Sequence, residues 1–344
     1  MSPTTYAPFT SPGPESDELV RRGELRVDVL LSEDERLAML RAEARRGLTA
    51  VPKQLPPKWF YDERGSLLFE EITRLPEYYL TRREREILVA RAEEIAAATR
   101  ATSLVELGSG SSEKTRLLLD ALVGQRTLRT FMPFDVCLPA LEQAGAALVD
   151  EYPGVSVHAI VGDFHLHTSV LRHSAGRRLV AFLGSTIGNL DATERAGFFR
   201  SLRLALRSGD SLLLGADLVK DKERLDAAYN DAAGVTAAFN KNVLRVLRRD
   251  LGADFDEDKF DHVAGFDPDR ELVDIRLRAR VSHVVRVKAL GLTVAFGAGE
   301  QMRTEISTKF TRPGLGRELV AAGFSPGRWW TDDRGDFSLS LWWA

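Results

Sequence analysis

A stretch rich in glycine and serine, residues 103–115, carries the residue types best suited to binding a small molecule. It reads Ser-Leu-Val-Glu-Leu-Gly-Ser-Gly-Ser-Ser-Glu-Lys-Thr, so Gly108 and Gly110 follow a short, mainly apolar run. Glycine lets the backbone adopt a positive φ and lets a ligand lie against the main chain. The N–H groups of a helix that follows such a turn attract an anion or a carboxylate. The stretch is a candidate ligand-binding loop after the first strand of an open α/β sheet; a purely structural turn is the alternative.

Two phosphate-binding motifs can be compared with this loop, and neither matches. A P-loop requires Gly-x-x-x-x-Gly-Lys-Ser/Thr, but here Glu113 precedes Lys114 and would face the phosphates. In the dinucleotide motif Gly-x-Gly-x-x-Gly, Glu113 would replace the third glycine. The pattern Glu106-x-Gly108-x-Gly110 instead resembles the first motif of Rossmann-like methyltransferases, which bind S-adenosylmethionine. That ligand carries a sulfonium cation and no phosphate, so acidic neighbours are compatible with it.

Two further carboxylates follow at the ends of the next two predicted strands. Asp135 comes 27 residues after Gly108, near the spacing of a ribose-binding carboxylate. Asp163 could accept a hydrogen bond from an adenine amino group while Phe164 stacks on the ring. Each acid alone is more often a helix cap or a turn residue. Because Glu106 and both aspartates stand at successive strand ends, a cofactor site is the favoured interpretation.

The elements that position these residues follow from the apolar patterning, which alternates between strand and helix periods as in a parallel α/β sheet. Ser32 with Glu35 predicts a capping box, and Thr81 a helix N-cap. The predicted strands are residues 103–107, 130–135, 155–161, 178–183, 211–217 and 337–343, with two more between 271 and 296. The predicted helices are residues 32–46, 66–73, 81–98, 114–122, 192–206, 221–250 and 314–322.

The composition narrows the class of protein. The 344 residues suffice for two domains. The net charge is −3 with scattered basic residues, so neither nucleic acid nor a membrane surface is an expected partner. No apolar run reaches the length of a signal peptide or a membrane span. The single cysteine, Cys137, agrees with a cytoplasmic location, and without a Cys/His cluster no metal is expected.

The alternation of strands and helices also suggests a division into domains. Residues 1–23 are rich in Pro, Ser and Thr, which predicts a disordered tail. Residues 220–309 interrupt the alternation and are predicted, together with residues 24–81, to form a lid domain. Residues 82–219 and 310–344 are then the sheet domain, with residues 298–307 returning the chain toward it.

Six segments together carry a more specific resemblance: residues 55–61, 75–79, 106–115, 182–189, 231–240 and 305–307. With these segments, the chain from about residue 47 to its end resembles the L-histidine Nα-methyltransferases, which form hercynine in the first step of ergothioneine biosynthesis. The resemblance implies a Rossmann-like class I methyltransferase sheet with an inserted α+β substrate-binding lid domain. It implies the transfer of three methyl groups from S-adenosylmethionine to the α-amino nitrogen of L-histidine. One departure is Leu80, where relatives usually carry proline.

The resemblance also implies roles for individual residues. Contacts with the cofactor are implied for Gly108, Lys114, Asp135, Asp163 and Phe164. Contacts with histidine are implied for Tyr78, Asn189, Tyr229, Glu305 and Ser307. Among these, Asn189 and Tyr229 would hold the amino-acid head and the other three the imidazole. Asn189 and the nearby Tyr61 are the catalytic candidates.

The expected chemistry needs positioning more than acid–base catalysis. Methyl transfer from a sulfonium is an in-line displacement by a neutral amine, so no strong general base is expected and Tyr61 at most relays a proton. One alternative is the same scaffold acting on tryptophan or tyrosine. Glu305 argues against it, because a hydrocarbon ring would leave the carboxylate unpaired. The other alternative is a non-catalytic regulator that binds S-adenosylmethionine, against which Asn189 argues weakly.

Overall fold

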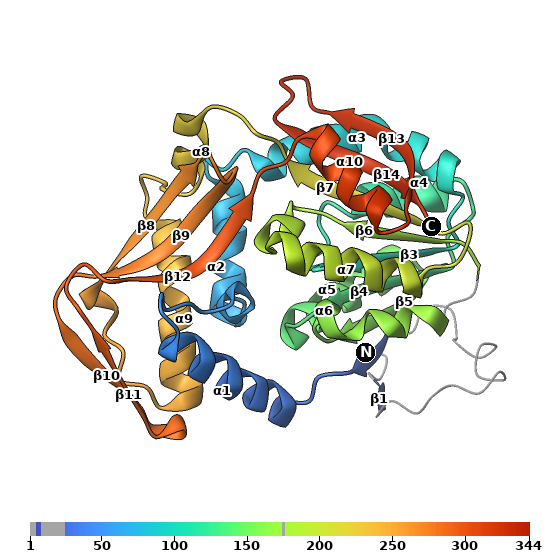
Figure 1. Ribbon diagram of the computed structural model, residues 1–344. Helices are drawn as coiled ribbons and strands as arrows, with labels where there is room; N and C mark the ends of the chain where they lie inside the picture. Colours follow the sequence, from blue (N-terminus) through green and yellow to red (C-terminus); the bar gives the residue numbers. More distant parts are fainter. Residues whose placement is uncertain (1–4, 8–24, 174–175) are drawn as a thin grey trace.

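A computed structural model describes residues 5–7, 25–173 and 176–344 (Figure 1). Among these residues, nine strands form one large sheet in the order β1-β2-β5-β4-β3-β6-β7-β14-β13. The strands from β1 to β7 pair in parallel, β14 runs antiparallel to β7, and β13 antiparallel to β14. Their bounds are β1 (Thr5–Ala7), β2 (Leu25–Val29), β3 (Ser103–Leu107), β4 (Thr130–Asp135), β5 (Ser156–Val161), β6 (Arg178–Phe182), β7 (Ser211–Asp217), β13 (Ser325–Thr331) and β14 (Phe337–Trp343).

Helices cover both faces of this sheet (Figure 1). They are α3 (Leu80–Thr99), α4 (Arg116–Gly124), α5 (Leu138–Glu151), α6 (Phe164–His167), η3 (Thr168–His173), η4 (Thr186–Asn189), α7 (Ala192–Ala205) and α10 (Arg312–Ala321). Every residue of β3, β6 and β7 is buried, as expected for strands covered on both faces. Successive strand residues point to opposite faces. Leu104 therefore packs in a cluster with α3 and α4, and Val105 in a second cluster with α7 and α10.

A smaller α+β part lies beside the large sheet, at the left of Figure 1. A three-stranded antiparallel sheet, ordered β12-β9-β8, and the hairpin β10–β11 form its strands. The strand bounds are β8 (Phe260–Asp267), β9 (Leu272–Ala279), β10 (His283–Val287), β11 (Leu292–Phe296) and β12 (Gln301–Thr308). The helices are α1 (Glu33–Thr49), η2 (Pro57–Phe60), α2 (Glu63–Arg74), α8 (Lys222–Ala228), α9 (Val235–Leu251), η5 (Glu257–Lys259) and η6 (Lys288–Leu290). Apart from β2 and the start of α3, the helices and strands within residues 24–81 and 220–309 lie in this smaller part; that it is a lid domain remains a prediction.

Two expectations about the order of the chain need correction. Strand β2, predicted to belong to the lid, pairs with β5 and so joins the large sheet. Within the predicted tail, Thr5–Ala7 forms β1 on the edge of β2, while the rest of the tail lies outside the described residues. Residues 298–307 do lead back toward the large sheet as expected: β12 pairs with β9, and directly after it the Phe310 N–H donates to the Asp217 carbonyl at the end of β7. In each case the pairing partner is distant in sequence, which local patterning does not reveal.

The local predictions at helix ends have mixed outcomes. The capping box of Ser32 and Glu35 is confirmed at α1. Thr81 is not an N-cap, because α3 begins at Leu80 after Tyr79. Leu80 thus holds the first helical position, where proline is also well accommodated, so leucine there preserves the same helix start. The helix predicted over 221–250 is split, because Gly234 adopts a φ of +76° before α9.

Candidate active site

A cavity of about 1290 Å³ lies between the carboxyl ends of the parallel strands and the smaller part. Strand β3 has β4 on one side and β6 on the other, and open α/β sheets bind ligands where the strand order reverses in this way. The volume exceeds the roughly 300–1,000 Å³ of ordinary small-molecule pockets and leaves room for two ligands. The predicted site residues that line it are Tyr61, Tyr78, Gly108, Lys114, Asp135, Asp163, Phe164, Asn189 and Glu305. Tyr229 and Ser307 are not among its lining residues.

The glycine loop has the backbone that its sequence predicts. Gly108 and Gly110 adopt φ values of +68° and +49°, in the left-handed region that favours glycine. The Gly108 N–H donates to the Phe134 carbonyl at 2.8 Å, which ties the loop to the end of β4. A Cβ at Gly110 would meet no atom within 4 Å. Glycine is therefore required by the backbone conformation, and the space above it stays open to a ligand.

Asp135 joins this loop to the end of β4. Its Oδ2 accepts from the Gly110 N–H at 2.9 Å, and its Oδ1 accepts from the Cys137 N–H at 3.0 Å. Burial raises the pKa of Asp135, and these backbone hydrogen bonds oppose the rise. Each carboxylate oxygen retains a lone pair. Asp135 can therefore accept two further hydrogen bonds from a ligand in the cavity.

Asp163 and Phe164 form the next part of the wall. Asp163 caps α6 by accepting from the His165 N–H, so the helix-cap interpretation is correct, but its Oδ2 also accepts from Lys58 Nζ at 2.9 Å. Burial alone would raise the pKa of Asp163, but Lys58 and His165 bring it below the usual value. The Phe164 ring meets Phe182 edge-on at 5.2 Å. These contacts hold a carboxylate and an aromatic face side by side.

Glu106 and Lys114 lie beside the glycine loop, each with a distinct electrostatic environment. Glu106 is buried and accepts from the Thr115 hydroxyl, while its Oε2 has no hydrogen-bond partner among the described residues. Burial raises the pKa of Glu106 to about 7, although Thr115, Ser112 and Lys114 oppose the rise. Lys114 pairs with Glu84. The cavity thus has a buried carboxyl oxygen available to a donor.

Glu84 is a residue of this site that the sequence analysis missed. It is fully buried, and both its oxygens lie within hydrogen-bond distance of the Gly184 N–H, at 2.8 and 3.0 Å. A Cβ on Gly215 would lie 2.1 Å from Glu84 Oε1, so that glycine provides its space. Glu84 stands in the run Arg-Arg-Glu-Arg-Glu, which is typical of an exposed helix face. Only the packing of α3 on the sheet distinguishes it from its neighbours.

Asn189 and Glu305 meet on the other wall of the cavity. Asn189 ends η4, and a Cβ on the preceding Gly188 would lie 2.8 Å from the Thr308 carbonyl oxygen. Because Gly188 has none, η4 packs directly on β12, and Asn189 and Glu305 line the same cavity. Burial raises the pKa of Glu305 to about 7, and the charge of Lys309 and the Asn189 side chain oppose the rise.

Two tyrosines complete this wall. The Phe69 ring meets Tyr61 at 5.7 Å and Tyr78 at 6.2 Å, both edge-on, so these contacts hold the two phenols in place. Burial raises the pKa of both phenols well above the usual value. Both hydroxyls therefore keep their protons at neutral pH.

Tyr229 and Ser307 lie behind the cavity wall. Tyr229 packs edge-on against Tyr78 at 6.3 Å, and its hydroxyl lies 2.8 Å from Ser307 Oγ. Lys309 Nζ donates to both hydroxyl oxygens and pairs with Asp217. The structure thus brings these two predicted residues to each other and to Tyr78.

The described part of the chain contains neither a metal-binding cluster nor a membrane-spanning helix. Within residues 5–7, 25–173 and 176–344, no group of three or more His, Cys, Asp or Glu side chains is arranged to hold a metal ion. Over the same ranges, no helix combines the length and apolar character needed to cross a bilayer.

Comparison with known proteins identifies the family. A family model for histidine-specific, S-adenosylmethionine-dependent methyltransferases matches residues 40–344. Histidine N-alpha-methyltransferase of Mycolicibacterium smegmatis is 57% identical over 311 residues, which cover 90% of this chain and 97% of that protein. The protein of the same name from Mycobacterium tuberculosis is 55% identical with the same coverage. Ergothioneine biosynthesis protein 1 of Neurospora crassa is 35% identical over 205 residues, 58% of this chain and 23% of that protein. The chain therefore belongs to the family of histidine-specific, S-adenosylmethionine-dependent methyltransferases.

Proposed function

We propose that this chain transfers three methyl groups from S-adenosylmethionine to the α-amino nitrogen of L-histidine. The product is hercynine, and the reaction is the first step of ergothioneine biosynthesis. One observation carries the proposal: Glu305 lines the same cavity as Asn189 and the row of acids at the ends of β3, β4 and β5. A carboxylate in a closed site suits the N–H of an imidazole and disfavours a hydrocarbon ring.

The residues around the glycine loop fit S-adenosylmethionine. The unpaired Oε2 of Glu106 suits the ammonium group at the methionine end. Asp135 would accept from the ribose hydroxyls and Asp163 from the adenine amino group, with Phe164 against the ring. Lys114 would pair with the methionine carboxylate of the cofactor. Because Gly108 has no side chain, the cofactor could lie close to the backbone there.

The residues proposed to bind the substrate would position the α-amino group of histidine in its neutral form. S-adenosylmethionine, when bound, supplies a methyl group on a positively charged sulfur. If the Asn189 amide donates to Glu305, its oxygen remains free to accept an N–H from the α-amine without stabilising the ammonium form. The Tyr61 phenol, whose pKa lies well above its usual value, acts as a proton relay and not as a base. Each pKa unit of the amine above the working pH costs about 1.4 kcal/mol, so a cationic neighbour promotes the reaction by favouring the neutral amine.

The remaining substrate contacts follow the family pattern. We propose that Tyr229 holds the amino-acid head together with Asn189, and that Tyr78, Glu305 and Ser307 hold the imidazole. The 6.3 Å edge contact between Tyr78 and Tyr229 and the hydroxyl contact between Tyr229 and Ser307 support this grouping.

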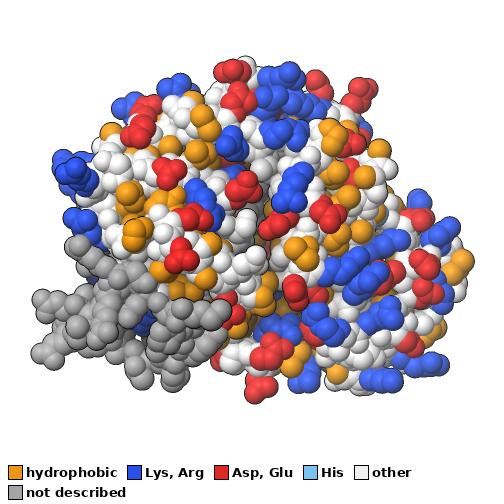
Figure 2. All heavy atoms as spheres, turned by 180° about the vertical axis from the view of Figure 1, so that it is seen from behind, with side chains coloured by type: hydrophobic (Ala, Val, Ile, Leu, Met, Phe, Trp, Pro, Cys, Tyr) orange, Lys and Arg blue, Asp and Glu red, His pale blue; other side chains and the backbone are white. Residues whose placement is uncertain are grey.

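Location and partners are inferred from the same features. The thiol of Cys137 is buried and free, which supports a reducing, cytoplasmic location. Figure 2 shows Lys and Arg intermingled with Asp and Glu on the face that it presents. This mixing supports small-molecule partners over nucleic acid or a membrane surface. No metal requirement is proposed, so activity should survive treatment with a chelator.

The decisive experiment is mass spectrometry of an amino-acid panel incubated with the protein and S-adenosylmethionine. Histidine should gain three methyl groups on its α-nitrogen, while tryptophan and tyrosine should remain unchanged. Methylation of the imidazole, or arrest after one methyl group, would contradict the proposal. Methylation of tryptophan in preference to histidine would support the alternative substrate, and binding without transfer would support the regulator.

A further inference from the structure

Lys309 is a fully buried cation beside the proposed substrate site. Its side chain and that of its ion-pair partner Asp217 are both 0% exposed, with Nζ 2.9 Å from Asp217 Oδ2. The ammonium also lies 2.8 Å from the Tyr229 hydroxyl and 2.8 Å from Ser307 Oγ. A buried ion pair is no more stable, as a rule, than apolar residues of the same volume. Net stability alone therefore does not explain a lysine at this position.

The position of Lys309 along the chain relates it to the proposed imidazole contacts. Glu305 and Ser307 belong to β12, and Lys309 follows the strand directly. Side chains two residues apart on an extended chain point to the same face. Glu305, Ser307 and Lys309 thus form a row, and Lys309 is its buried end.

The ammonium group determines the direction of the hydrogen bonds around it. An ammonium has three donors and no acceptor, and the three donors of Lys309 are used by Asp217, Tyr229 and Ser307. Both hydroxyl oxygens must therefore accept from it. Of the two hydroxyl hydrogens, one lies in the 2.8 Å contact between Tyr229 and Ser307. The other has no acceptor in this group of residues and remains available.

We propose that Lys309 is a positioning residue for the histidine substrate: it holds the Tyr229 and Ser307 hydroxyls as acceptors, so that the remaining hydroxyl hydrogen is donated to the substrate carboxylate. The inference rests on the proposed function, in which Tyr229 holds the amino-acid head. The positive charge of Lys309, which lies behind the cavity wall, would also favour binding of the substrate carboxylate. Tyr229 is 7% exposed and packs on Tyr78, a residue of the cavity wall, so it lies directly behind that wall.

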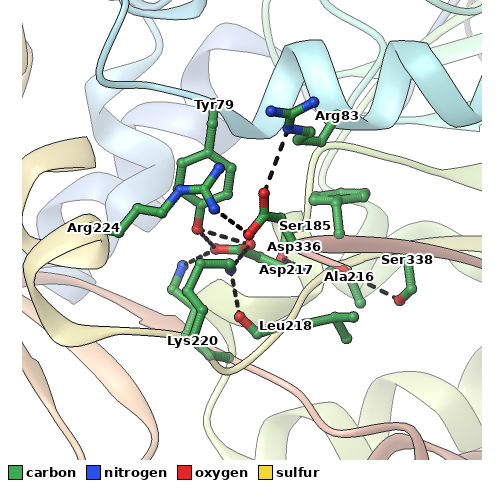
Figure 3. Close-up of polar contacts among 12 residues, drawn as sticks. Tyr79, Arg83, Ser185, Ala216, Asp217, Leu218, Lys220, Arg224, Asp336 and Ser338 are labelled. Carbon is green, nitrogen blue, oxygen red and sulfur yellow. Dashed lines mark hydrogen bonds and ion pairs between the residues drawn. The ribbon is translucent and has the colours of Figure 1, made fainter. Parts of the chain in front are cut away.

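Asp217 provides a matched control for this proposal. Figure 3 shows Tyr79 and Lys220 converging on its carboxylate; Lys220 Nζ lies 2.6 Å from Oδ1 and the Tyr79 hydroxyl 2.9 Å from Oδ2. Lys309→Met consequently leaves Asp217 with two partners and should fold. Lys220→Met removes the other ion pair of the same aspartate, but its Nζ has no hydrogen bond to Tyr229 or Ser307. The two variants thus separate loss of an ion pair from loss of hydroxyl orientation.

The test is calorimetric titration of histidine into full-length protein saturated with S-adenosylhomocysteine, the product of methyl transfer. Lys309→Met should weaken histidine binding about 10-fold or more, the size expected for a lost hydrogen bond to a charged group. S-adenosylhomocysteine affinity should stay within about twofold, and Lys220→Met should bind histidine within about twofold of the wild type. In a Tyr229→Phe background the effect of Lys309→Met should fall below about threefold, because coupled residues are not additive.

Several results of these titrations would overturn the proposal. Unchanged histidine affinity in Lys309→Met, with a lowered Tm, would overturn the proposal and leave Lys309 a structural ion pair. Equal losses in Lys309→Met and Lys220→Met would overturn it as well. Should Lys309→Met not fold, Lys309→Gln should also weaken histidine, because its amide oxygen offers the hydroxyl hydrogen an acceptor; unchanged binding by Lys309→Gln would again overturn the proposal. Wild-type protein that fails to bind histidine would refute the proposed function itself.

Discussion

Replacing Glu106 by glutamine should stabilise the free protein and weaken its cofactor binding. Burial raises the pKa of Glu106 from 4.5 to about 7, so the folded chain favours the neutral carboxyl. At about 1.4 kcal/mol per pKa unit, the ionised form destabilises the fold by roughly 3 kcal/mol. This penalty is absent below pH 4.5, grows as the pH rises, and is complete above pH 7. Glutamine has the same shape and cannot ionise.

The assay for this effect is thermal unfolding of the ligand-free protein between pH 5 and pH 8. Glu106→Gln should raise the Tm by a few degrees at pH 8, and the gain should shrink toward pH 5. Glu318→Gln serves as the control, since it removes a carboxylate that is 31% exposed and paired with Arg195 at 2.9 Å. The control should slightly lower the Tm. A lower Tm in Glu106→Gln at pH 8, or a gain independent of pH, would refute the reasoning.

The second half of the prediction concerns the ligand. If the free Oε2 of Glu106 accepts from the ammonium of S-adenosylmethionine, the glutamine variant should bind it about 10- to 150-fold more weakly, from roughly 1.5–3 kcal/mol for a charged hydrogen bond. A variant that is more stable alone and weaker in binding distinguishes a ligand contact from a structural carboxylate. Equal affinity by calorimetry would place the methionine end elsewhere.

Three other substitutions test the site. Glu305→Ala should lower kcat/KM for histidine about 10- to 150-fold and reduce discrimination against tryptophan, with cofactor affinity unchanged. If kcat/KM for both substrates stays within about twofold of the wild-type value, Glu305 does not bind the imidazole. Asp135→Ala should weaken cofactor binding about 10- to 150-fold, and an unchanged Kd in folded protein would place the ribose elsewhere. Glu84→Gln keeps an acceptor for the Gly184 N–H but loses the ion pair with Lys114. It should weaken cofactor binding several-fold, whereas the control Glu113→Gln, on the exposed loop, should not. Equal Kd values for the two variants would argue against Lys114 as a cofactor contact.

Many of the residues proposed to bind the cofactor could be predicted from the sequence, because they follow the ends of successive strands. Parallel strands end at one edge of a sheet, so acids that follow successive apolar runs must lie near one another. The order β5-β4-β3 confirms this for Glu106, Asp135 and Asp163. Gly108 and Gly110 were predictable for a similar reason, since few other residues adopt their φ values.

The substrate side could not be derived in this way. Glu305 and Asn189 are 116 residues apart and meet only because Gly188 allows η4 to touch β12. Tyr229 and Lys309 are likewise brought together by folding alone. Here local periodicity is uninformative: only resemblance to a family pointed to Glu305 and Tyr229, and nothing in the sequence pointed to Lys309.

The two sides of the cavity are joined by contacts that lie outside the cavity itself. Strand β12 belongs to the smaller part, yet Gly188 of η4 packs on Thr308, Lys309 pairs with Asp217 at the end of β7, and the Phe310 N–H donates to the Asp217 carbonyl at 2.8 Å. In-line transfer loses rate steeply when the reacting atoms are displaced by about 1 Å, so this seam keeps the substrate wall in register with the cofactor loop. The fixed position of this wall also constrains the transfer of successive methyl groups. Under the proposed function, the α-nitrogen must present a new lone pair after each methylation, so the amino-acid head would turn within the cavity while Glu305 holds the imidazole.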